Sequence, residues 1–290
     1  MINFFETLSL RVLGRTIKVQ CEDAEVWALL TATYGTMCCE VERADLNYTA
    51  GRQKRSGAFF LRGKGGRPLE ALDDGEFLFL FEKEITIELQ KLRPDLYFMH
   101  GGVLEFRGNA LMLVGASGSG KSTTTWALLH HGFRYLSDEL APVDVTTLEV
   151  YPYPHALCLK NEPPGIYPLP PKSLRTSRTL HVPVDLLPSG VTRVPLPLTA
   201  IFFLRYHRDL SVPTMAPISQ AAAAAHLITN ALNPLAHPGY GLDGAVEIST
   251  RVPSFEVFRS DLHEICALVK AAVKTVLSSA VKQRRSGSKY

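Results

Sequence analysis

A glycine-rich stretch of the chain, residues 115–122, carries the residue types that bind the phosphates of a nucleotide. Its glycines allow several backbone N–H groups to turn toward one ligand without side-chain obstruction. Lys121 can contact the outer phosphates, and the Ser122 hydroxyl can join the ligand shell of a magnesium ion. The sequence therefore predicts that ATP and Mg²⁺ are the cofactors. The predicted nucleotide-binding residues are Gly115, Ala116, Ser117, Gly118, Ser119, Gly120, Lys121, Ser122 and Thr123.

The segments on either side of this stretch favour a phosphate-binding loop over a chance match. Apolar residues 111–114 predict a strand before it, and residues 123–131 are compatible with a helix that ends at Gly132. A glycine turn that spells the motif by chance is the competing interpretation, and the two flanking elements disfavour it. Kinases, ATPases, GTPases and transporter motor domains share this loop, so other residues must select the reaction.

Two adjacent acids, Asp138 and Glu139, follow a short predicted strand that begins near Phe133. If this strand lies beside the strand that precedes the loop, both carboxylates come close to Ser122. One can then bind the metal while the other accepts a proton from an attacking hydroxyl. In the alternative, Asp138 only positions the metal and Glu139 activates water, as in an ATPase. Residues 134–137 do not form the unbroken apolar run expected before such a metal-binding aspartate, which disfavours this alternative.

The motifs together resemble the catalytic core of the HPr kinase/phosphorylase family, which is similar to phosphoenolpyruvate carboxykinase. They are His100-Gly101-Gly102-Val103, Gly108, the glycine loop and residues 132–139. The resemblance covers about residues 98–160, with looser similarity at 201–206 and 252–257. It implies an α/β fold with a mixed sheet, in which a phosphoenolpyruvate carboxykinase-like P-loop core follows a small mixed N-terminal region.

The resemblance also implies roles for individual residues. Asp138 is expected to be the general base, with His100 as its neighbour and Lys121 on the phosphates. Ser122 and Glu139, with Asp138 close by, are expected to hold the magnesium ion, although the family carries aspartate at the position of Glu139. Thr123 replaces the glutamate usual in HPr kinases, and no phosphorylase signature is found near the C-terminus.

These departures indicate a diverged HPr-kinase-related protein. Such proteins include kinases that phosphorylate a serine of a lasso-peptide precursor. The expected partner is therefore a peptide or small protein that bears an acceptor serine, and a homo-oligomer is possible by analogy with the family. A nucleotide hydrolase or switch, and a non-catalytic nucleotide-binding partner protein, are the two competing functions.

Composition narrows the class of protein and its compartment. The chain has 290 residues, 46% of them hydrophobic, which is enough for a buried core. A formal net charge of +3 is too small for a protein that coats nucleic acid, and no apolar run is long enough for a membrane span. Five cysteines without a CxxC pair favour free thiols and a cytoplasmic location.

The predicted organisation is an N-terminal mixed region (1–97), the kinase core (98–280) and a flexible basic tail (281–290). Helices are expected at 76–92, 219–232 and 262–280, and after Asp23. Hairpins are expected at 51–67 and around 107–109, and the proline-rich residues 152–197 are expected to form an extended insertion. Further cations that could contact phosphate are Lys160, Arg205, Arg251 and Arg259.

Overall fold

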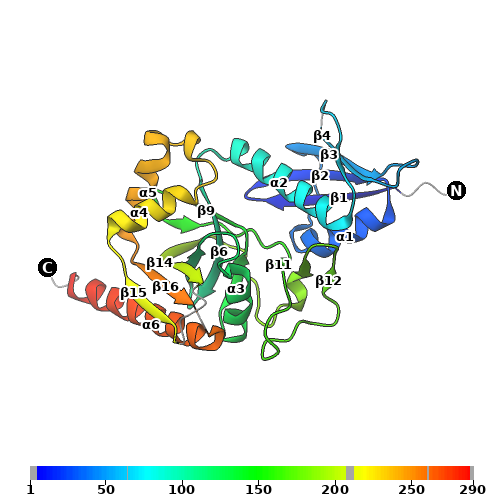
Figure 1. Cartoon of the computed structure of the whole chain (residues 1–290). Coiled ribbons are helices and arrows are strands. Elements are labelled where there is room, and N and C mark those ends of the chain that lie inside the picture. The colour runs from blue at the N-terminus through cyan, green and yellow to red at the C-terminus, as the bar shows by residue number, and fades with distance from the viewer. Residues whose placement is uncertain (1–4, 64, 207–211, 260, 288–290) are drawn as a thin grey trace. The chain divides into compact units, whose positions relative to one another are not determined.

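The computed structural model describes residues 5–63, 65–206, 212–259 and 261–287. The chain divides into two compact units (Figure 1). Unit 1 comprises Met1–Arg93 and Pro154–Leu187, and unit 2 comprises Pro94–Tyr153 and Pro188–Tyr290. This division differs from the continuous one predicted, because much of the proline-rich stretch packs with the N-terminal residues.

Unit 1 is built on a five-stranded sheet with the order β1-β2-β3-β4-β5. The predicted hairpin after residue 51 and the helix up to residue 92 are confirmed. Its first elements are β1 (Glu6–Val12), β2 (Arg15–Cys21), α1 (Ala24–Tyr34), η1 (Gly35–Met37), β3 (Leu46–Arg52), β4 (Phe59–Gly63), β5 (Leu69–Ala71) and α2 (Asp74–Leu92).

One face of this sheet is buried and the other is open. In β2, Ile17 and Val19 are fully buried, whereas the alternate residues Lys18 and Gln20 reach solvent. This alternation is what a strand with one packed face requires. Helices α1 and α2 cover the buried face, where Phe77 of α2 stacks on Phe59.

The proline-rich stretch adds a second, three-stranded sheet to unit 1. It contains β11 (Leu157–Leu159), β12 (Leu174–Arg175), β13 (Leu180–Val182) and η2 (Val184–Leu186). The backbone N–H of Ala156 donates to the carbonyl of Thr33 at 2.8 Å, which joins this stretch to the end of α1. The expectation of an extended or looping insertion without long helices is therefore confirmed, and short strands form within it.

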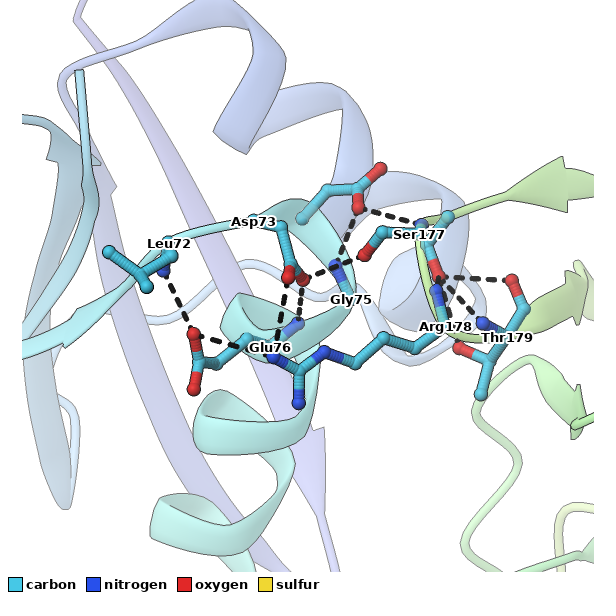
Figure 2. Close-up of polar contacts among 9 residues, drawn as sticks. Leu72, Asp73, Gly75, Glu76, Ser177, Arg178 and Thr179 are labelled. Carbon is cyan, nitrogen blue, oxygen red and sulfur yellow. Dashed lines mark hydrogen bonds and ion pairs between the residues drawn. The ribbon is translucent and has the colours of Figure 1, made fainter.

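A polar junction ties the turn between β12 and β13 to the beginning of α2 (Figure 2). Ser177 Oγ donates to Asp73 Oδ1 at 2.7 Å, and Arg178 Nη2 lies 3.2 Å from Asp73 Oδ2. Asp73 also caps α2 by accepting from the N–H of Glu76. A Cβ on Gly75 would lie 2.9 Å from the Arg178 side chain, so only glycine permits this close approach.

The junction is expected to weaken in acid. The hydrogen bond from Ser177, followed by that from the Glu76 N–H, lowers the pKa of Asp73 to about 2. A lowered pKa means that the charged form stabilises the fold above the ordinary carboxyl range, and that this contribution is lost as pH falls toward 2. Asp73→Asn keeps a helix cap but removes the charge.

We therefore predict that Asp73→Asn lowers the urea midpoint of unfolding at pH 6, and that its difference from the unchanged protein shrinks steadily between pH 5 and pH 2. Urea denaturation followed by circular dichroism across this range measures the difference. A gap that stays constant down to pH 2 would show that the Asp73 charge does not support the junction.

Unit 2 is built on a larger mixed sheet with the order β10-β9-β6-β7-β14-β16-β15, and β8 pairs with β6 off this path. Its strands are β6 (Tyr97–Phe106), β7 (Asn109–Val114), β8 (Arg134–Ser137), β9 (Leu140–Val143), β10 (Glu149–Val150), β14 (Leu196–Tyr206), β15 (Thr214–Pro217) and β16 (Ser254–Arg259). Its helices are α3 (Lys121–His130), α4 (Gln220–Thr229), η3 (Pro234–Ala236), η4 (Pro238–Gly241), α5 (Leu242–Arg251) and α6 (Leu262–Gly287).

The centre of this sheet sets where a ligand can bind. Strands β7, β14 and β16 are parallel to one another, so their carboxyl ends meet at one edge. Side chains of Met112 and Phe203 pack with α4 and α5 on one face, and α3 and α6 contact the sheet elsewhere. In open α/β sheets, ligands bind outside the carboxyl ends of such parallel strands.

Two sequence expectations about unit 2 need correction. Strand β8 pairs antiparallel with β6 and not with β7, so β6 separates it from the strand that precedes the glycine loop. The predicted flexible tail also begins inside α6, which continues to Gly287. The hairpin at 107–109 is confirmed, with Arg107 and Gly108 both at positive φ, as a tight hairpin turn requires.

Among the residues that the structure describes, no helix is long and apolar enough to cross a membrane.

Candidate functional site

The glycine loop connects the carboxyl end of β7 to the beginning of α3, as the motif predicts. Gly118 and Gly120 have φ values of 83° and 87°, which side-chain-bearing residues rarely adopt. Gly120 is the N-cap of α3, so no side chain at this position blocks the helix amides. The positive end of α3 therefore faces the space that the loop encloses, which is the usual arrangement for anion binding.

Gly115 is required because two neighbours crowd its Cα. A Cβ at this position would lie 2.6 Å from the carbonyl oxygen of Leu204 in β14 and 2.7 Å from Ser119 Oγ. Ser119 is itself buried, and its hydroxyl has no hydrogen-bond partner among the described residues. The loop is thus folded tightly against the end of β14, and a buried hydroxyl lies on its inner side.

Lys121 is buried and folds back over the loop. Its Nζ donates to the carbonyl oxygen of Gly115 at 2.7 Å and lies 3.4 Å from that of Ala116. This arrangement keeps the ammonium group within the loop, where it can exchange a carbonyl for a phosphate oxygen. Ser122 and Thr123 follow in the first turn of α3 and are half-buried. The loop residues therefore fit a nucleotide phosphate group.

Asp138 lies close to α3 even though β8 is not next to β7. Its side chain is 1% exposed, and a Cβ built on Gly102 of β6 would lie 3.7 Å from its Oδ1. The same Cβ would lie 2.7 Å from Oγ1 of Thr125, one turn beyond Ser122 on α3. Because Gly102 has no side chain, Asp138 and Thr125 can both lie close to β6 on the same face of the strand. Asp138 therefore lies near the helix that carries the loop.

His100 lies against Glu139. Its Nδ1 is 3.2 Å from the Glu139 carbonyl oxygen and 3.4 Å from the carboxylate Oε2. The backbone of Gly101 also donates to the Glu139 carbonyl at 3.3 Å. Both side chains are about one-third exposed, so this pair is open to a ligand while Asp138 is buried. The roles predicted for His100, Asp138 and Glu139 stay predictions.

The arginines that the sequence suggested as phosphate ligands lie at different places in the structure. Arg205 lies at the carboxyl end of β14, next to the residue that touches Gly115, and its Nε is 2.5 Å from Glu256 Oε1. Arg251 instead ends α5, before β16 begins, and pairs with Glu247. The side chain of Arg259 lies outside the described residues, and Lys160 is an exposed residue of unit 1. Of the two arginines whose side chains are described, Arg205 lies nearer in the sheet to the glycine loop.

The structure adds Thr125 to the residues found from the sequence. Thr125 is fully buried, and its hydroxyl has no hydrogen-bond partner among the described residues. A threonine inside a helix gives no signal of its own in a sequence, so only the fold reveals its position beside Asp138. Within the described ranges, no group of three histidine, cysteine, aspartate or glutamate side chains could hold a metal ion.

Comparison with known proteins does not assign the chain to a family. No protein-family model matches the chain, and no curated protein is similar to it. The solved structure of the Hpr(Ser) kinase/phosphatase from Coxiella burnetii aligns with 66% of this chain and 96% of that chain, at 12% identity and a TM-score of 0.35. A TM-score of this size does not establish a common fold, so function has to be inferred from the site itself.

The contact across Gly102 gives a test of the site's packing. We predict that Gly102→Ala costs about 1–3 kcal/mol of stability, because the new methyl group overlaps Thr125 Oγ1. Thr125→Ala removes that oxygen, so the double variant should recover a large part of the loss. Unfolding free energies of the two single variants and the double variant measure this coupling. Strictly additive effects would contradict the contact.

Proposed function

We propose that this chain binds a nucleoside triphosphate, with ATP as the expected donor, and transfers the terminal phosphoryl group to a hydroxyl. The observation that carries the proposal is the convergence of the glycine loop and the buried Asp138 on the first two turns of α3. A phosphate-binding loop alone is compatible with many reactions. A carboxylate held beside it adds a group that can act on the attacking nucleophile.

The loop residues are expected to bind and orient the phosphates. Backbone N–H groups of the loop and of the first turn of α3 would face the phosphate oxygens, and Lys121 would neutralise part of their charge. Arg205, at the carboxyl end of the neighbouring strand, is positioned to approach the transferred group, because guanidinium matches phosphate oxygens in a bidentate way. Its present partner, Glu256, holds the arginine at that edge.

In the proposed reaction the acceptor hydroxyl attacks the terminal phosphorus. A bond forms between the hydroxyl oxygen and phosphorus, the bond from phosphorus to the bridging oxygen breaks, and the nucleoside diphosphate leaves. Asp138 accepts the hydroxyl proton. Mg²⁺, when bound with the nucleotide, would offset the charge of the phosphates. Ser122 and Glu139, with Asp138 as the alternative carboxylate, are the residues that would hold it.

The acceptor is proposed to be a serine of a peptide or small protein, and most specifically of a ribosomally made lasso-type precursor. The motif resemblance at residues 98–160 supports this choice. A cytoplasmic location and assembly into a homo-oligomer belong to the same proposal, and neither nucleic acid nor a membrane is proposed as a partner.

The central test is phosphoryl transfer detected by mass spectrometry. A panel of serine-containing peptides and small carrier proteins, incubated with the protein, ATP and magnesium, should yield a product heavier by one phosphoryl group. Asp138→Asn should slow this transfer at least about a hundredfold, the range for loss of a general base. Because Asn is close to Asp in size and can still form hydrogen bonds, we expect nucleotide binding to persist.

Glu139→Gln is the matched variant, since it removes the other adjacent charge. If the protein is a kinase in which Asp138 is the base, Glu139→Gln should change the magnesium dependence of phosphoryl transfer more than the maximal rate of transfer. Steady ATP hydrolysis with every acceptor unmodified, abolished by Glu139→Gln, would instead establish the hydrolase in which Glu139 activates water. Tight nucleotide binding without any turnover would establish a non-catalytic binding protein.

A further inference from the structure

The open face of the unit 1 sheet contains a second candidate site, separate from the glycine loop. An open pocket of about 440 Å³ lies on it. The residues that line the pocket come from four consecutive strands of the sheet. They are Thr7, Lys18, Gln20, Asn47, Tyr48, Thr49, Arg62 and Gly63.

The strand register arranges the polar side chains of the pocket in rows. Thr7 of β1 is opposite Gln20 of β2, Gln20 is opposite Thr49 of β3, and Thr49 is opposite Arg62 of β4. These four residues form one row across the sheet on the face that α1 and α2 leave open. Lys18 and Asn47 form the next row. A row of hydroxyl, amide and guanidinium groups offers both donors and acceptors to a ligand.

The charge of the pocket is entirely positive. Of the described residues that line it, Lys18 and Arg62 are charged and none is a carboxylate. Arg62 lies over the ring of Phe60 and forms no ion pair within the described part of the chain. Among the described residues, Lys18 Nζ donates to the backbone carbonyl of Glu42 at 3.4 Å and to no other group, which leaves donors for a ligand. The nearby Asp45 carboxylate accepts hydrogen bonds from Thr16 and lies 3.7 Å from Arg15 Nη1, which offsets its charge.

We infer that this face of unit 1 binds an extended, acidic segment of a polypeptide. The rows of amide and hydroxyl groups suit a backbone and polar side chains, and the two cations suit two carboxylates. A single-stranded nucleic acid would need exposed aromatic rings on which its bases could stack. Tyr48 of the pocket lining and Phe60 beneath Arg62 are 6% and 7% exposed, so neither ring is free for a base to stack on.

The positions of the cations predict the spacing of the acids in the partner. Arg62 and Lys18 are two strands and one row apart, which corresponds to about 12 Å for a strand spacing of ~4.8 Å and a rise of ~3.4 Å per residue. An extended chain covers that distance in about three or four residues. A partner with two acidic residues three or four positions apart therefore fits best.

The test is a binding measurement with the full chain and a fluorescein-labelled probe. The probe is a flexible Gly/Ser peptide of about twelve residues with two glutamates four positions apart. Lys18→Gln/Arg62→Gln is the test variant. Arg11→Gln is the matched control, since Arg11 is an exposed cation of β1 outside the pocket lining. All these side chains reach solvent, and circular dichroism confirms that each variant is folded.

We expect the glutamate peptide to bind in a salt-sensitive way, the double variant to weaken binding at least about tenfold, and Arg11→Gln to change it less than about twofold. No binding at about 1 mM peptide, equal binding of a lysine version, or equal loss in the Arg11 control would overturn the inference. Tighter binding of a single-stranded oligonucleotide, dependent on Lys18 and Arg62, would overturn it as well. The Asp138→Asn variant should bind the peptide as the unchanged protein does. A failure of this inference can therefore be distinguished from a failure of the proposed transfer reaction.

Discussion

The close packing around two glycines of β6, Gly101 and Gly102, is the constraint on which the candidate site depends. A Cβ on Gly101 would lie 2.9 Å from the carbonyl oxygen of Leu113 in β7, and one on Gly102 would lie 2.7 Å from Thr125 of α3. Larger residues here would push β6 away from the strand before the glycine loop and from the helix after it. Because neither glycine has a side chain, β6 leaves room for Asp138, which follows β8, to approach α3.

Strand β6 also divides the site into a buried part and an open part. Beyond Gly102, it pairs with β7 and β8, and the site there contains the buried Asp138. Before Gly101, it pairs with β9, and His100 meets the partly exposed Glu139. Two adjacent acids thus have different surroundings, because successive residues after a strand point in different directions. Such a difference is what separate roles for two carboxylates require.

The sequence predicted the local elements well because their signals are local. The strand, glycine loop and helix around Lys121 follow from apolar runs and glycines, and α2 follows from the helical spacing of its apolar residues. The sequence did not predict that β8 pairs with β6, since the residue pattern of one strand does not say which other strand it pairs with. It also missed that residues 154–187 return to unit 1, because contacts such as that between Ser177 and Asp73 join residues far apart in the chain.

The most direct measurement is nuclear magnetic resonance of the chain labelled with ¹⁵N-glycine, titrated with ATP and magnesium. If residues 115–122 bind the phosphates, the amide resonances of Gly118 and Gly120 should shift strongly, whereas that of Gly14, in the first hairpin of unit 1, should not move. Unchanged loop resonances at saturating nucleotide, or shifts confined to glycines of unit 1, would contradict the assignment of this loop as the phosphate-binding site.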